Sequence, residues 1–385
     1  MSIPERASTH ASNTRCTPFL LALLVLSAGL TAGCQAEHDP PSLINKLRVL
    51  GVRAQPPQVR LGPPTKLDML VVGHKGDAKL CYAWAFCPIA LSLEGNFRCV
   101  DAELQTPLGT GAETTLSSAQ VQAAMDPDKL KKVLAKHGFS LPSQLDQGGQ
   151  SDINDIAKQL ASFEFFVLFK VADSREFGGM CPTEANAMLD NVCADRTRCL
   201  AGYKRLNFAM LPKYYNENPY FDGIELGDVR WPAGVTPTVV PYDSKPSAWD
   251  QVLDDGVDAE LFEGYGPTAL KITPTFDEKI RERTPEEPDE NGEPGREEVL
   301  FSWFSSVGRY QKQRTYHDFA DNLFLAPELK DGESEKQVSL WVVMRDRRNG
   351  TAWLHRKIVV KAGKSNPAKI LCEIDKTLEG CDDKL

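Results

Sequence analysis

Short alternating apolar runs, separated by proline, glycine and aspartate, constrain the fold of this chain most. The run Leu47–Arg53 ends at Pro56-Pro57, and a later run places Tyr82, Trp84 and Phe86 on one face. Successive side chains of a strand point to opposite faces, so each run can bury one face of a sheet. Short strands of this kind with turn signals between them predict an all-β sandwich.

The second half of the chain repeats this pattern. Trp303 is central in the run 300–304, as Trp84 is in the run 82–86, and Asn349-Gly350 between two apolar runs is the strongest two-residue hairpin signal. A helix is expected after Asp126, the N-cap, and a second one from Ser151. We therefore predict a mainly β chain with two immunoglobulin-like β-sandwich domains, the first with a helical insertion.

The composition shifts suggest domain boundaries. We expect a signal peptide at 1–33, a tether at 34–44, a first sandwich at 45–212, a second at 213–362, and a C-terminal tail with a cysteine pair at 363–385. Within the first sandwich, the helical insertion spans about 117–161 and a Cys-rich segment spans 178–202.

Eight of the ten cysteines follow residue 40, and this even number indicates disulfides formed in an oxidising compartment. Local spacing favours Cys87–Cys99 and Cys372–Cys381. Eight cysteines allow 105 pairings, so the order within the remaining set stays open: Cys81, Cys181, Cys193 and Cys199. A zinc site is the weaker alternative because no CxxC occurs, and we expect no metal and no cofactor.

The first 35 residues have the parts of a secretory signal. Arg6 and Arg15 precede an uncharged segment, whose core from Phe19 to Leu26 is shorter than the roughly 20 apolar residues that span a bilayer. Small residues then lead to Cys34. An uncleaved signal anchor and an ordinary signal with an incidental cysteine are the alternatives.

The end of this segment, Leu30-Thr31-Ala32-Gly33-Cys34, resembles the bacterial lipobox, with Thr31 where a branched apolar residue is usual. The resemblance implies cleavage after Gly33, a diacylglyceryl thioether on Cys34 and acylation of the new amine, and Gln35 implies export to the outer membrane. Several acyl chains such as palmitate hold a protein firmly, whereas one chain binds only marginally. The protein is therefore expected at the outer membrane, facing the periplasm or the cell surface.

The second half also resembles PKD-type and related immunoglobulin-like modules. There an S-W-x-x-x-x-G strand and turn precedes an apolar-Ala-Pro element and a V-x-V-x-D-x-x-G-G hairpin. Met344 and Asn349 depart from that pattern, and the matching residues are Ser302, Trp303, Gly308, Ala326, Pro327, Val342, Asp346 and Gly350. The two-domain order is similar to that of uncharacterised lipoproteins of myxobacteria over most of the chain. These resemblances imply a fold and a location, and no activity.

The net charge and the absence of known catalytic motifs reduce the number of function classes that fit the chain. A net charge of −9 argues against nucleic acid, which needs a clustered basic surface. No G-x-S-x-G, H-E-x-x-H or G-x-G-x-x-G occurs, so no catalytic residue is assigned. The segment Tyr316–Asp321 sets a histidine among carboxylates, and we interpret it as an exposed polar loop. The acidic groups at 254–258 and 288–292 lack the spacing of a calcium loop.

The leading hypothesis is a non-enzymatic cell-envelope protein, held at the membrane by its lipid, whose sandwiches bind another envelope protein or a polysaccharide. The alternative is a hydrolase or carbohydrate-processing accessory that uses carboxylates of residues 229–266 and 283–296. A purely structural spacer is the third hypothesis.

Overall fold

The computed structural model describes residues 40–60, 62–90, 97–137, 164–209, 212, 215–242, 269–281, 283–288, 294–363 and 367–381. Cys34 and the helix expected from Ser151 lie outside these residues. The chain is mainly β, as predicted, with two β-sandwiches.

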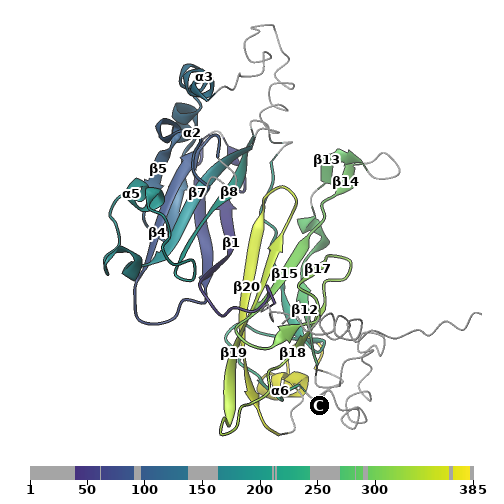
Figure 1. Ribbon diagram of the computed structural model, residues 1–385. Coiled ribbons are helices and arrows are strands. Elements are labelled where there is room, and N and C mark those ends of the chain that lie inside the picture. The colour runs from purple at the N-terminus through teal and green to yellow at the C-terminus, as the bar shows by residue number, and fades with distance from the viewer. Residues whose placement is uncertain are drawn as a thin grey trace, which may run out of the picture. The chain divides into compact units, whose positions relative to one another are not determined.

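Two sheets form the first sandwich, with strand orders β1–β3–β6 and β2–β8–β7–β4–β5 (Figure 1). Trp84, Phe86 and Phe165 are buried between the sheets, because alternation turns all three to the inner face. The strands are β1 (Arg48–Gln55), β2 (Val59–Arg60), β3 (Thr65–Val72), β4 (Leu80–Cys87), β5 (Thr106–Gly109), β6 (Glu113–Leu116), β7 (Glu164–Asp173) and β8 (Cys199–Ala209).

Two helices follow β6, within the predicted insertion. α2 (Ser118–Ala124) begins with a capping box, because Ser117 and Gln120 each accept the other's backbone N–H through a side-chain oxygen. α3 (Pro127–Lys136) begins after Asp126, whose Oδ1 accepts the N–H of Asp128 and of Lys129 at 3.0 Å each. α2 packs on the sandwich core and α3 beside the Cys87–Cys99 disulfide.

The second sandwich has the strand orders β10–β9–β12–β18–β16 and β11–β20–β19–β15–β17. Its core surrounds Trp231, Phe301, Trp303 and Phe324, which are fully buried. The strands are β9 (Gly223–Leu226), β10 (Val229–Arg230), β11 (Thr238–Val239), β12 (Leu270–Thr275), β15 (Leu300–Ser305), β16 (Arg309–Tyr310), β17 (Arg314–Tyr316), β18 (Asn322–Leu325), β19 (Glu335–Arg345) and β20 (Thr351–Lys361).

β19 and β20 form the predicted hairpin, but its turn is longer than two residues. The last strand pair is Arg345 with Thr351, so residues 346–350 make the turn. Asp346 Oδ1 accepts the Gly350 N–H at 2.6 Å and closes the larger loop. A Cβ on Gly350 would lie 2.0 Å from Asp346 Oδ2, so this position requires glycine.

Three segments differ from the expected boundaries. Residues 199–202 of the Cys-rich segment belong to β8. Residues 283–296, one of the two segments whose carboxylates the hydrolase alternative uses, contain the paired strands β13 (Arg283–Pro288) and β14 (Pro294–Arg296). The C-terminal tail contains α6 (Pro367–Ile374), which buries Leu371 and Cys372 in the core of the second sandwich.

The tether also ends earlier than expected, because its last residues contact the second sandwich. Leu43 forms a parallel bridge with Ser305 at the end of β15. The Ile44 N–H donates to Ser305 O at 2.8 Å, and the Ser305 N–H donates to Ser42 O at 2.9 Å. Ile44 is then buried against Trp341 and Val343.

Candidate functional site

All eight cysteines that follow residue 40 form disulfides. The structure contains Cys87–Cys99 and Cys372–Cys381, the two pairs favoured by spacing. It resolves the open order of the other four as Cys81–Cys181 and Cys193–Cys199. Cys34 lies outside the described residues, so the predicted lipid attachment stays a prediction.

Two of these disulfides start from the same face of one sheet. In the strand register, Cys81 of β4 and Cys199 of β8 both lie opposite Ala172 of β7. Their partners lie in the Cys-rich segment, whose short helix α5 (Ala185–Asp190) buries Met188 against this face. The segment is thus a lid on the outer face of the sheet, joined to it at two points.

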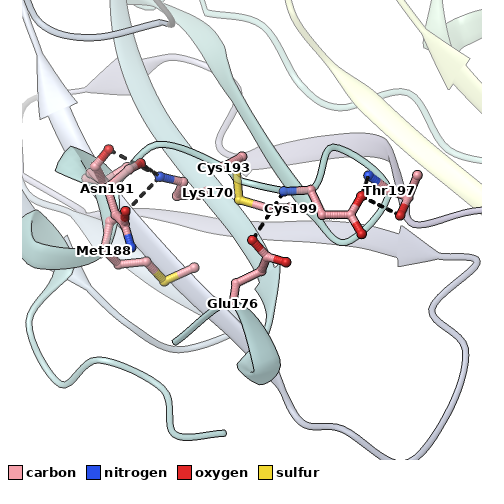
Figure 2. Close-up of a disulfide and its surroundings, with 9 residues drawn as sticks. Lys170, Glu176, Met188, Asn191, Cys193, Thr197 and Cys199 are labelled. Carbon is pink, nitrogen blue, oxygen red and sulfur yellow. Dashed lines mark hydrogen bonds between the residues drawn. A yellow bond between two sulfur atoms is a disulfide. The ribbon is translucent and has the colours of Figure 1, made fainter. Parts of the chain in front are cut away.

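Lys170 of β7 lies between the sheet and this lid and bonds to the lid. Its side chain is only 3% exposed, and Nζ donates to Met188 O at 2.9 Å, to Leu189 O at 3.4 Å and to Asn191 O. Figure 2 shows these bonds beside the Cys193–Cys199 disulfide. The last carbonyls of a helix lack partners within it and attract a cation, so Lys170 is a C-terminal cap supplied by a strand. Burial lowers the pKa of Lys170 to about 8.

A second group of polar residues joins the two sandwiches. Asn216 is fully buried, and its Nδ2 donates to Asp346 Oδ2 and to Arg348 O, each at 3.1 Å. Its Oδ1 accepts from Arg348 Nη2 at 2.9 Å, and its N–H donates to Gln58 Oε1 at 2.9 Å. Burial raises the pKa of Asp346, while the bonds from Asn216 and Gly350 oppose that shift. The turn of the β19–β20 hairpin is therefore bound to the segment that leaves the first sandwich.

Apolar side chains complete this inter-sandwich contact. Leu50 and Val72 of the first sandwich pack against Trp341 and Val343 of the second. The Arg53 guanidinium lies 4.6 Å from the centre of the Trp353 ring, a cation–π contact. Burial of apolar area gives the contact stability, and the polar network fixes its register.

A cleft of about 500 Å³ lies beside the contact, lined by the four cationic side chains of Lys204, Arg205, Arg345 and Arg347 together with Asp346. Each cation has a protein partner. Lys204 donates to Asn349 O and to Thr351 Oγ1, and Arg345 donates to Leu50 O and to Ser302 Oγ. Arg205 pairs with Glu164, and Arg347 pairs with Glu298. Lys204 and Arg345 thus bond across the inter-sandwich contact, whereas Arg205 and Arg347 each form an ion pair within one sandwich. Because all four cations have partners, the cleft is not an open anion site.

The segment Tyr316–Asp321 has a different character from the polar loop that we expected. Tyr316 and Phe319 are 48% and 72% exposed, at a tight turn that follows the edge strand β17. His317 Nε2 lies 3.0 Å from Asp318 Oδ1, so its contact with a carboxylate is local. The exposed feature of this turn is an aromatic pair.

The described part of the chain contains no group of three or more His, Cys, Asp and Glu side chains placed to hold a metal ion. The hydrolase alternative depends on carboxylates of residues 229–266 and 283–296, of which residues 243–266 and 289–293 lie outside the described residues. In the same described ranges, no helix is long and apolar enough to cross a membrane.

Sequence reasoning missed Lys170 and Asn216. The signal for Lys170 was present, because it is the one charged residue in the run 165–172. No sequence signal pointed to Asn216, because its hydrogen-bond partners are distant in sequence.

No protein-family model and no curated protein matches the chain. Among solved structures, it is similar to the three N-terminal domains of the highly immunogenic outer capsid protein Hoc of bacteriophage RB49, with 9% identity and a TM-score of 0.17 over 82% of this chain and 59% of that one. It is also similar to dimeric latent PorU of Porphyromonas gingivalis, with 11% identity and a TM-score of 0.20 over 84% of this chain and 25% of that one. The chain thus spans less than two thirds of either structure.

Proposed function

We propose that this protein is an outer-membrane lipoprotein, anchored through Cys34 and facing the periplasm or the cell surface, that acts as a non-catalytic binding module for an envelope protein or a polysaccharide. The observation that carries the proposal is the disulfide framework. Disulfides persist in oxidising compartments, and a lipobox acts only on an exported chain. The four disulfides and the lipobox therefore support the same location from separate parts of the chain.

The inter-sandwich contact supports a binding role. Its buried polar network holds two sandwiches in one register, so surface groups on both keep fixed relative positions. Fixed surfaces lower the entropy cost of binding.

Mass spectrometry of the mature N-terminus tests the anchor. We expect the mature chain to begin at an acylated Cys34, and Cys34→Ala to abolish both the acylation and the cleavage after Gly33. Cys16→Ala, which changes the other cysteine of the N-terminal segment, is the matched control and should stay acylated. A free Cys34 thiol, or a Cys34→Ala protein that is still cleaved after Gly33, would contradict the anchor.

Crosslinking in intact envelopes tests the binding role. A recurring protein or glycan on the crosslinked protein is the expected result. Recovery of neither, from envelopes in which Cys34 is acylated, would leave an anchored spacer and overturn the binding role.

A further inference from the structure

We propose that the aromatic pair Tyr316 and Phe319 is a binding site for a neutral, hydroxyl-rich polysaccharide, whose sugar rings stack on the two exposed faces. This inference rests on the proposed binding function and names the class of its ligand.

The backbone of the turn directs the Tyr316 and Phe319 side chains to the same side. Tyr316 and Phe319 form an antiparallel bridge, and the Phe319 N–H donates to Tyr316 O at 3.0 Å. Residues directly opposite in such a bridge project to the same face, with Cβ atoms about 5 Å apart. The pair therefore presents aromatic surface from both residues on that side, and about half or more of each residue is exposed to solvent.

The turn that carries the pair is fixed by the core of the second sandwich. Thr315 is buried, accepts from Trp303 Nε1 at 2.9 Å and donates from Oγ1 to Ala320 O at 3.0 Å. The His317 N–H donates to Val299 O at 3.0 Å. Both ends of the turn are thus bound to the sheet, so the backbone that carries the two rings loses little freedom when a ligand binds.

The polar groups around the aromatic pair can form hydrogen bonds with the hydroxyl groups of a sugar. Asp318 is exposed beside Phe319, and Arg314 is exposed two residues before Tyr316 on the same strand face. A carboxylate accepts a hydrogen bond from a hydroxyl group, and a guanidinium donates one to a hydroxyl oxygen. The apolar C–H face of a sugar ring covers an aromatic ring while its hydroxyls reach such neighbours. The opposite charges of the two groups favour a neutral polymer over an anionic one.

The size of the pair argues against other occupants. Two such rings expose roughly 250 Å², whereas a stable protein interface needs about 800 Å² on each side. Insertion into a lipid surface would bring the Asp318 carboxylate towards anionic headgroups and the apolar layer, which costs free energy. Two sugar rings match the available area.

Affinity electrophoresis of the purified full-length protein in mild detergent tests the site. Dextran, laminarin and mannan are the neutral probes, and polygalacturonate is the anionic comparison. We expect at least one neutral polymer to retard the protein. Phe319→Ala and Tyr316→Ala should each weaken that binding about tenfold, while Phe319→Trp retains it. Tyr220→Ala is the matched control, because Tyr220 is 49% exposed and outside the turn.

Retardation by none of the neutral polymers would overturn the inference, as would equal retardation of wild type and Phe319→Ala. A crosslinked envelope protein lost specifically in Phe319→Ala would reassign the pair to a protein partner. Acylation of Cys34 and crosslinking elsewhere on the protein are read separately, so these outcomes leave the proposed function standing.

Discussion

Lys170 is a single residue that joins a sheet, a helix and a disulfide-bonded segment. An ammonium group surrounded by apolar side chains is costly, and three backbone carbonyls of the segment containing α5 offset part of that cost. The balance still disfavours the charged form, so the pKa of Lys170 is about 8 in the folded protein.

This depressed pKa predicts a pH dependence of stability. A lysine that titrates near 8 when folded and at about 10.5 when unfolded binds more protons in the unfolded state between those values. The contribution of Lys170 to the free energy of unfolding should therefore rise with pH, by about 1–2 kcal/mol between pH 7.5 and 9.5. Urea unfolding of wild type and Lys170→Met measures the difference.

Lys204, whose pKa burial also lowers to about 8, provides the comparison. Lys204→Met should remove a separate part of the rise, and the double variant should lose both. NMR titration of the Lys170 side chain gives the midpoint directly, and a midpoint near 10.5 would contradict the prediction.

At the scale of elements, the β19–β20 turn has two roles. Asp346 closes the turn through the Gly350 N–H and, through its other oxygen, accepts from Asn216. The hairpin geometry and the inter-sandwich contact therefore share one carboxylate.

Replacement of Asn216 tests whether the hairpin turn and the inter-sandwich contact depend on the same carboxylate. Asn216→Ala leaves a buried carboxylate and the Arg348 carbonyl without that partner, and we expect the free energy of unfolding to fall by about 3 kcal/mol. Urea denaturation followed by tryptophan fluorescence checks the value. Asn191→Ala, an exposed position that bonds through its backbone carbonyl, should change stability by less than about 0.5 kcal/mol. Similar effects for both variants would contradict a special role of Asn216.

The tryptophan strands could be predicted from the sequence because their information is local. Trp84 and Trp303 occur in period-two apolar runs, and both are fully buried. The contact of Asn216 with Asp346 could not be predicted, because it joins residues 130 positions apart with no pattern between them. The aromatic pair could be predicted only in part. Its residues were evident in Tyr316–Asp321, but their exposure follows from the place of β17 at a sheet edge.

At the scale of the whole molecule, the disulfides differ in the length of chain that they close. Cys81–Cys181 joins residues 100 apart, whereas Cys193–Cys199 joins residues 6 apart. Closing a longer loop removes more conformational freedom from the unfolded chain.

Loss of the longer link should therefore cost more. Replacing both Cys81 and Cys181 by alanine should destabilise the protein by about 4 kcal/mol, and the same change at Cys193 and Cys199 by about 2 kcal/mol. Thermal unfolding of the two double variants at equal protein concentration compares them. A larger loss from the shorter link would show that native contacts of the Cys-rich segment, rather than chain entropy, determine its effect.

The pairing of residues 42–44 with Ser305 determines the path of mechanical load. A pull on the chain ahead of Ser42 reaches the end of β15 through two backbone hydrogen bonds before it reaches β1. The first sandwich, although next along the chain, receives tension through its contact with the second sandwich while that pairing holds. The second sandwich is thus the part that first bears any force transmitted from the N-terminal side.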